Sequence, residues 1–427
     1  MTKRKMRMSN RRLRNKQSRE QKLNYFKARP PSKFLHKMAR PIYISRIVVP
    51  KNVNVKYEFD IKKLKPPFLV LFAHPSIQDH IFVTHATRPF VANSVISRWY
   101  FHNAFLRLVL PVVGGIPKKL FTNETNVVKN VISVIRKGGI VNISPEGVNA
   151  PSGKSLTLIP STTKLLKKLN VPVVSIAVNG AFLTFPSYNR KAKHVGRIDV
   201  IVDLMFTPEE IAQKSNEELL AEMSQKLHYN DFKWARENNV EFKAKNRTKG
   251  LNHLLYICPK CKSQFKMEAA DNKIQCAQCG FGAFVDTRFQ LVSLREGDEL
   301  PTDIAEWFNM QDDIIKEEVK ADDFEIREKC SVKNFSKRGF RLADKYRGEL
   351  IINKDGVRFI GKDIKTGSKK EIFKEIQKLP RVSNTINKGI YFYDGDVCCE
   401  FALDNGIKAI QCTQAIYHLH NLHEERQ

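Results

Sequence analysis

The sequence predicts an α/β fold, in which helices flank a mostly parallel sheet, followed by a small cysteine-rich unit and a C-terminal β-rich module. Short apolar runs alternate with longer helical segments between about residues 66 and 204. This alternation is typical of α/β layers built on parallel strands. Two C-x-x-C pairs come next, and strand patterns joined by tight turns fill the end of the chain.

Length and composition indicate a globular protein with an anionic partner. A chain of 427 residues has room for about two to four folded units. Its 73 Lys and Arg exceed its 44 Asp and Glu, and the resulting charge of +29 attracts nucleic acid, anionic lipid headgroups or phosphorylated substrates. No apolar run approaches the length of about 18 residues that spans a membrane, and no secretory signal is evident. We therefore expect a cytoplasmic protein.

Residues 1–50 are predicted to form a basic amphipathic arm. Its first 40 residues contain fifteen Lys or Arg and a single acidic residue, Glu20. A solvated tail is one interpretation of such a charge run. Apolar residues interleaved with the charges favour contact with an anionic membrane surface instead. These residues are Phe34, Leu35, Met38, Ile42, Tyr43, Ile47 and Val48.

The α/β domain is expected over residues 51–245. Its apolar runs predict strands at 68–73, 91–97, 140–143, 173–178 and 197–204. Apolar residues on one helical face predict helices at 122–137 and 161–169, and a mixed acidic and basic segment, 207–238, is predicted to be helical and to close the domain.

A histidine and a carboxylate follow the first strand. His74 comes directly after it, at the sheet edge where α/β proteins bind ligands, and Asp79 lies five residues later. An imidazole can accept a proton near neutral pH. A carboxylate that folds back across the turn would orient the ring and stabilise the imidazolium. Taken alone, this H-x4-D spacing is more typical of an ordinary hydrogen-bonded histidine.

A second carboxylate strengthens the catalytic interpretation. The strand at 140–143 leads into Ser144-Pro145-Glu146-Gly147. Because parallel strands end at the same edge of a sheet, we expect Glu146 to share a cleft with His74 and Asp79.

Four sequence blocks resemble those of the lysophosphatidate (1-acylglycerol-3-phosphate) acyltransferase family. They are the segment from His74 to Asp79, "GGIPKK" at 114–119, "PEG" at 145–147 and "VPV" at 171–173, and they cover about residues 60–230. The resemblance implies a glycerolipid acyltransferase-like fold on the cytoplasmic face of a membrane. It also implies transfer of an acyl group from acyl-CoA or an acyl carrier protein to a lysophospholipid hydroxyl, with 1-acylglycerol-3-phosphate as the expected acceptor.

The same resemblance assigns roles to residues. His74 would be the general base, Asp79 would hold its ring, and Glu146 would help to hold the acceptor or the dyad. The residues expected to bind substrate are Gly115, Lys118, Lys119, Pro145, Gly147 and Asn149.

The second and third blocks depart from the family pattern. Lys118 and Lys119 stand where the family usually has an arginine, and Val148-Asn149 replaces the usual Thr-Arg. A lysine offers a point charge rather than a bidentate fork. The acceptor headgroup therefore stays open, and the sequence does not indicate the acyl chain length or the type of acyl donor.

The cysteine pairs predict a zinc ribbon at residues 250–290. Fourteen residues separate the first C-x-x-C pair from the second, a pattern that suits a tetrahedral zinc site formed by Cys258, Cys261, Cys276 and Cys279. Four thiolates leave no coordination position for water, so the zinc is expected to be structural.

The remaining chain is expected to form a linker at 291–340 and a β-rich module at 341–427. The segment 348–361 predicts two strands joined by an Asp355-Gly356 turn, and further strands are predicted at 389–393 and 397–403. A helix at 415–424 closes the chain. Strands capped by one helix resemble a pleckstrin-homology or GRAM-type barrel.

Two other functions remain open. Zinc ribbons and basic arms occur in nucleic-acid-binding proteins. The ribbon, however, lacks a basic and aromatic face, so nucleic acid is not the expected partner. A non-catalytic lipid-binding protein could also keep this fold. The absence of a G-x-S-x-G motif from the sequence disfavours a serine hydrolase.

Overall fold

A computed structural model describes residues 26–48, 51–122, 124–192, 194–335, 342–395 and 397–425. The first 25 residues of the predicted basic arm lie outside the described residues.

The first domain is built on a seven-stranded sheet with the order β1-β7-β6-β2-β5-β3-β4. All neighbouring strands are parallel except β6 and β7, which confirms the predicted mostly parallel α/β architecture. The strands are β1 (Val53–Tyr57), β2 (Phe68–Phe72), β3 (Asn93–Ser97), β4 (Gly115–Lys118), β5 (Ile140–Ile143), β6 (Val173–Asn179) and β7 (Ile198–Phe206).

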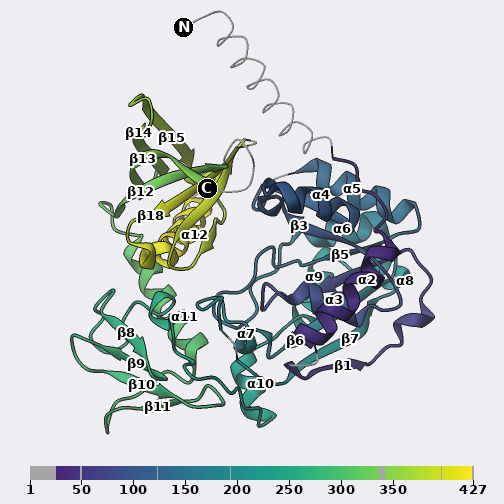
Figure 1. The fold of residues 1–427 in the computed structure, drawn as a ribbon, viewed down its shortest axis with the longest axis horizontal. Coiled ribbons are helices and arrows are strands. Elements are labelled where there is room, and N and C mark those ends of the chain that lie inside the picture. The colour runs from purple at the N-terminus through teal and green to yellow at the C-terminus, as the bar shows by residue number, and fades with distance from the viewer. Residues whose placement is uncertain are drawn as a thin grey trace, which may run out of the picture.

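The central strand β2 contributes to a core on each face of this sheet. Successive strand residues point to opposite faces, so Leu69 and Leu71 join one core while Val70 joins the other. The helix α3 (Asp79–Ala86) covers the face of Val70. The opposite face is covered by α5 (Thr125–Arg136), α6 (Ser161–Leu169), α8 (Pro208–Gln213) and α9 (Asn216–Lys226). Figure 1 shows this layered domain in colours from purple through blue to teal.

The segment 207–238 contains three helices rather than the single helical segment expected. Each helix begins at its own capping residue, because Thr207, Ser215 and Asn230 accept hydrogen bonds from backbone N–H groups of α8, α9 and α10 (Asp231–Glu237).

The cysteine-rich unit contains a four-stranded antiparallel sheet with the order β11-β10-β9-β8. Its strands are β8 (Met267–Ala270), β9 (Lys273–Cys276), β10 (Gly282–Val285) and β11 (Leu291–Ser293).

The described part of the expected linker at 291–340, which ends at residue 335, is instead part of the folded structure. It contains β11, the helix α11 (Ile304–Glu318) and the strand β12 (Glu325–Phe335). One face of α11 buries Ile304, Trp307 and Ile315 in the core. The acidic residues that suggested a linker lie between these apolar positions, and they masked the helical periodicity.

The C-terminal module is an antiparallel sheet with the order β15-β14-β13-β12-β18-β17-β16. The helix α12 (Ala409–Glu424) packs against β13, β16 and β17. The predicted hairpin and closing helix are therefore present, whereas the likeness to a pleckstrin-homology or GRAM-type barrel stays a prediction. The remaining strands are β13 (Leu342–Asn353), β14 (Gly356–Asp363), β15 (Lys369–Glu375), β16 (Ser383–Thr385), β17 (Gly389–Asp394) and β18 (Val397–Leu403).

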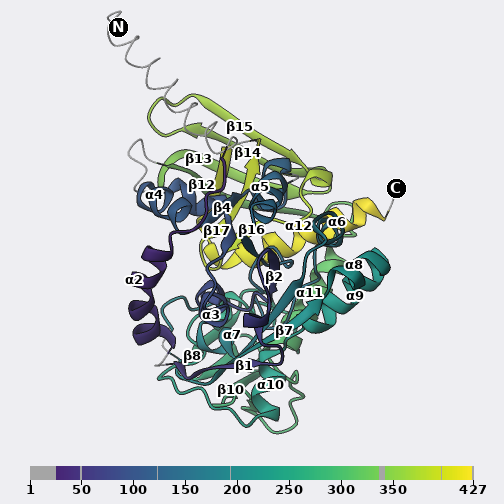
Figure 2. The ribbon, with the colours of Figure 1, turned by 90° about the vertical axis from the view of Figure 1, so that its right-hand side faces the viewer.

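One continuous hydrophobic core joins the three units. It includes Phe182 and Phe232 of the first domain, Cys258 of the cysteine-rich unit, Trp307 of α11 and Phe401 of the C-terminal sheet. Figures 1 and 2 show the C-terminal module and the cysteine-rich unit packed along one side of the first domain. The module is therefore held in a defined position.

A second contact joins the first domain directly to the C-terminal sheet. Trp99, in the 3-10 turn Arg98–His102 that follows β3, donates a hydrogen bond from Nε1 to Glu400 Oε2 over 3.2 Å. Its ring also packs on Tyr391, with the ring centroids 6.1 Å apart. Among the described residues, no helix combines the length and the apolar character that crossing a bilayer requires.

Candidate active site

His74 and Asp79 form a hydrogen-bonded pair at the carboxyl end of β2. The His74 Nδ1 atom lies 2.8 Å from Asp79 Oδ2, which also accepts a 2.8 Å hydrogen bond from the Ser76 backbone N–H. The Asp79 side chain is fully buried, whereas that of His74 is 26% exposed and lines a cavity. With Nδ1 committed to Asp79, Nε2 is the ring nitrogen that can accept a proton from a molecule in the cavity.

Glu146 lies behind the dyad rather than in the cavity. Its Oε1 accepts the His74 backbone N–H over 2.8 Å. Its Oε2 accepts the Leu156 backbone N–H over 3.1 Å and the Tyr229 hydroxyl over 3.2 Å. Glu146 is fully buried and does not line the cavity. Its geometry therefore suits positioning of the His74 backbone, and not the contact with the acceptor that the family resemblance also allowed.

The environment shifts the pKa values of these three groups. Burial acts to lower the pKa of His74, but the hydrogen bond and charge of Asp79, together with the charge of Glu146, outweigh it and raise that pKa above 6.5. Burial raises the pKa of Asp79, against the hydrogen bonds from His74 and Ser76. Burial likewise raises the pKa of Glu146 to about 7, opposed by the N–H groups of Leu156 and His74. Because the three groups interact through their charges, the protonation of each depends on the protonation of the others.

The cavity beside His74 has a volume of about 970 Å³. This lies at the upper end of the range for ligand pockets, about 300–1,000 Å³. Its wall in the first domain includes the segments that follow β2, β3, β5 and β6, because the carboxyl ends of these parallel strands meet at one edge.

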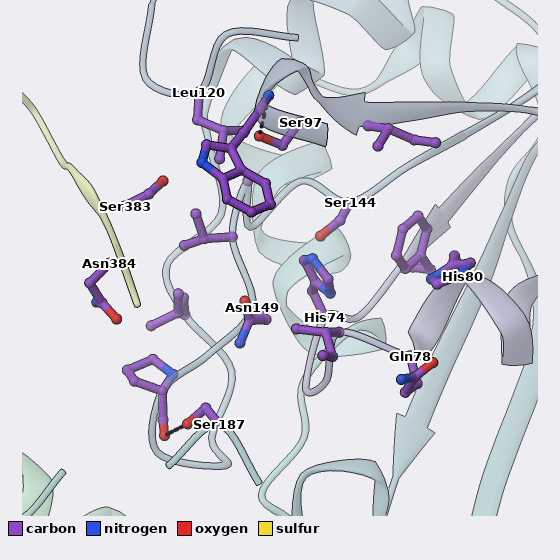
Figure 3. A pocket seen from close by; sticks show the side chains of 18 of the residues that line it. His74, Gln78, His80, Ser97, Leu120, Ser144, Asn149, Ser187, Ser383 and Asn384 are labelled. Atoms are coloured by element: carbon purple, nitrogen blue, oxygen red, sulfur yellow. Dashed lines mark hydrogen bonds between the residues drawn. The ribbon is translucent and has the colours of Figure 1, made fainter. Parts of the chain in front are cut away.

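The second wall comes from the C-terminal module, which sequence reasoning did not connect with the site. Arg381, Ser383 and Asn384 precede or belong to β16, and Thr413 and Tyr417 belong to α12. Figure 3 shows Ser383 and Asn384 on one side of the pocket and His74 and Ser144 on the other. No local sequence signal links these segments, which lie more than 300 residues from His74.

The structure divides the residues predicted to bind substrate into two groups. Lys118, Gly147 and Asn149 line the cavity. Gly115, Pro145 and Lys119 do not: Gly115 and Pro145 are buried in the domain, and Lys119 Nζ lies 3.6 Å from the Glu124 carboxylate.

The backbone of Gly147 accounts for its residue type. Its φ of +79° is in the left-handed region, and a Cβ atom there would approach Ile159 Cδ1 to 2.9 Å. A glycine thus lets the chain turn sharply after Glu146.

Ser144 is a further cavity residue that the sequence did not single out. Its hydroxyl is buried and has no hydrogen-bond partner among the described residues. Figure 3 shows it beside the His74 ring. A hydroxyl in this place could donate a hydrogen bond to an oxyanion formed next to His74.

The four predicted metal ligands come together in the cysteine-rich unit. The sulfur atoms of Cys258, Cys261, Cys276 and Cys279 all lie within 4.8 Å of one another. The Cys258–Cys279 and Cys261–Cys276 sulfur pairs are 3.6 and 3.8 Å apart. A tetrahedral zinc ion with Zn–S bonds of about 2.3 Å requires sulfur atoms about 3.8 Å apart. The four cysteines could therefore hold a zinc ion.

Comparisons with known proteins give a distant structural likeness. No protein-family model and no curated protein matches the chain. Among solved structures, the chain is similar to the 1-acyl-sn-glycerophosphate (LPA) acyltransferase PlsC from Thermotoga maritima, with a TM-score of 0.39 and 17% identity, over 46% of this chain and 76% of that chain. A likeness at this TM-score does not by itself identify an activity.

Proposed function

We propose that this protein transfers a fatty acyl group from an acyl thioester to the hydroxyl of a lysophospholipid at a membrane surface. The observation that supports this proposal most directly is the His74–Asp79 pair, which places a carboxylate-oriented imidazole in a cavity large enough for a lipid substrate.

In the proposed reaction His74 acts as the general base. Its Nε2 takes the proton of the acceptor hydroxyl as the oxygen attacks the thioester carbonyl carbon. The tetrahedral intermediate then collapses, the C–S bond breaks, and the imidazolium returns the proton to the departing thiolate. Asp79 stabilises the imidazolium in between, and the Glu146 carboxylate keeps the His74 backbone in place.

The expected acceptor is 1-acylglycerol-3-phosphate, and the expected donor is acyl-CoA or an acyl carrier protein. Basic side chains in the cavity suit an anionic substrate, and Lys118 is the one that comes from the predicted blocks. The direct test is incubation of the purified chain with labelled acyl-CoA and a panel of lysophospholipids. Failure to acylate any of them contradicts the proposal.

We further propose that an apolar surface beside the cavity binds the membrane. The helix α2 (Lys33–Tyr43) exposes Phe34, Leu35, Met38 and Ile42, and the neighbouring α4 (Ala104–Val112) exposes Phe105, Leu108 and Val112. The backbone N–H of Ser32, at the start of α2, donates a hydrogen bond to the Val112 carbonyl over 2.9 Å, so the two helices lie next to each other. Exposed apolar patches flanked by basic residues are typical of interfacial binding.

This apolar surface adjoins the cavity, because His36 of α2 and Leu106 and Leu110 of α4 line it. Docking of the surface on a bilayer would bring lipid substrates to the cavity entrance. The proposed location is therefore a membrane surface, with the protein peripherally bound, and the family-like sequence blocks favour its cytoplasmic face.

Vesicle binding tests this membrane surface. In a Phe105→Ser, Leu108→Ser double variant, removal of side chains that are 65% and 72% exposed should release the protein from phosphatidylcholine vesicles that contain phosphatidylglycerol. The measurement is co-sedimentation of protein with vesicles. Ile360→Ser, which removes a side chain that is 52% exposed on the C-terminal sheet, is the matched control and should sediment like the parent. Unchanged sedimentation of the double variant would argue against this surface.

The pH profile tests the dyad. Because the pKa of His74 is raised above 6.5, the parent's kcat/KM should rise with pH as the imidazole loses its proton, with an apparent pKa above 6.5. Asp79→Asn removes the negative charge that raises the pKa of His74. The rise of kcat/KM should therefore occur at lower pH in the variant, and its plateau rate should be lower. The measurement is the initial rate against pH for both proteins. An unshifted rise in the variant would mean that the titrating group is not His74.

A further inference from the structure

Two parts of the chain that are far apart in sequence enclose the cavity, and both contribute basic side chains. The lining cations are Lys118, Lys154 and Arg190 from the first domain and Arg381 from the C-terminal module. The carboxylate that lines the cavity, Asp312, lies 3.1 Å from His418 Nε2. The cavity thus has an excess of positive charge, which favours an anionic ligand.

The lysines of the second sequence block are poorly suited to bind this ligand alone. Lys119 is directed to Glu124, and its Nζ does not line the cavity. Burial acts against the charged form of Lys118 and lowers its pKa, although Glu124 opposes the shift. Lys118 thus offers one point charge from this block, and a second cation with a fork of donors would complete a site for a phosphate.

Arg381 has the features of that cation. It is partly buried, and no described carboxylate lies within ion-pair distance of its guanidinium. Its Cζ lies 5.0 Å from the centre of the Tyr417 ring, a contact that restrains the side chain without neutralising it. A guanidinium offers a planar fork of donors that matches phosphate oxygens.

Neighbouring contacts fix the wall that carries Arg381. Asn384 Nδ2 donates to Thr413 Oγ1 over 3.4 Å, joining β16 to α12 at the cavity surface. Tyr256 of the cysteine-rich unit donates to Gln414 of α12 over 3.0 Å, and Gln414 also lines the cavity. The Trp99–Glu400 contact holds the module directly against the first domain.

We propose that the C-terminal module completes the substrate-binding cavity and that Arg381 binds a phosphate group of the substrate. This proposal rests on the proposed acyl transfer and adds a binding residue outside the four family-like blocks. The phosphate could belong to the lysophospholipid acceptor or to the coenzyme A part of the donor.

Kinetics of Arg381→Gln test the proposal. With lysophosphatidate or acyl-CoA as the varied substrate, loss of a charged hydrogen bond should raise KM about tenfold or more, with a smaller change in kcat. A rise confined to lysophosphatidate, with KM for acyl-CoA unchanged, assigns the phosphate to the acceptor. A rise confined to acyl-CoA, and absent with an acyl-pantetheine donor that lacks phosphate, assigns it to the donor.

Two controls make the result specific. Lys388→Gln changes an exposed cation on the same module outside the cavity, and its KM values should equal those of the parent. Monoacylglycerol with an acyl-pantetheine donor, a pair in which neither substrate carries a phosphate, should be acylated equally well by the parent and by Arg381→Gln. The proposal is overturned if neither KM rises in Arg381→Gln, or if the variant loses activity toward phosphate-free and phosphate-bearing substrates alike.

Binding without turnover separates this proposal from the proposed function. Calorimetry with a short-chain lysophosphatidate, and separately with coenzyme A, measures whether Arg381→Gln weakens either Kd. If the parent binds one of these ligands, the variant binds it more weakly, and the parent transfers no acyl group, then the phosphate site stands and acyl transfer fails. If the parent is active and its Kd values equal those of the variant, the phosphate site fails alone.

Discussion

His74→Ala is expected to lower acyl transfer by about 10²–10⁴-fold, the contribution typical of a positioned general base. The loss should appear in kcat, because the His74 side chain is needed to remove the proton of the acceptor hydroxyl and binds little of the substrate. The measurement is the initial rate of lysophospholipid acylation from labelled acyl-CoA.

His74→Ala needs a control for folding, because His74 forms hydrogen bonds with two buried carboxylates. Its backbone N–H binds Glu146 and its ring binds Asp79, whose side chain is fully buried. Removal of the ring leaves that carboxylate without one partner, so the melting temperature of the variant should be measured beside its rate. His253→Ala, a change in the 3-10 turn Leu251–His253 outside the cavity, is the matched control and should keep the parent rate. Equal rates for His74→Ala and the parent would rule out the base assigned here.

Loss of zinc is expected to have the largest effect on stability. Structural zinc sites in small peptides bind with an apparent free energy of about 10–16 kcal/mol at pH 7, and this binding energy is available to folding. The purified protein should contain a single zinc ion per chain. Cys276→Ser should lose it and unfold at a lower temperature, as measured by metal analysis and thermal denaturation.

The position of the cysteine cluster predicts a wider consequence. Cys258 and Cys276 belong to the same continuous core as Phe182 of the first domain and Phe401 of the C-terminal sheet. Melting of the cysteine-rich unit should therefore loosen the module that forms one wall of the cavity, and activity should fall with the metal content. Cys398→Ser, a change to a buried cysteine outside the cluster, should keep the zinc. A metal-free parent that is stable and active would contradict the structural role of zinc.

Structural features that depend on short stretches of chain could be predicted from the sequence. The strand-to-helix turn from His74 to Asp79 is only six residues long, so the two side chains meet through local geometry. The same holds for the cysteine pairs, whose tight turns bring two sulfur atoms together in each C-x-x-C unit. The order of apolar runs likewise predicted the parallel sheet, because buried strands need continuous apolar residues.

The acidic stretch at about 296–323, within the expected linker, shows where this kind of prediction failed. Composition averages over all faces of a segment, whereas burial depends on one face of α11 and on the partners of β12. Trp307 and Ile315 are buried although acidic residues surround them in sequence. Only the packing of the neighbouring units reveals that this segment is part of the core.

The sequence by itself determined the dyad, the strand ends that present His74 and Glu146, and the cysteine cluster, because each depends on neighbours in the chain or on the common edge of parallel strands. Tertiary structure alone decided that Glu146 stands behind His74, that Lys119 turns to Glu124, and that Arg381 faces the cavity. These relations join residues that are distant in sequence or depend on side-chain burial. Contacts of that kind arise from the packing of whole domains, which no local pattern of residue types encodes.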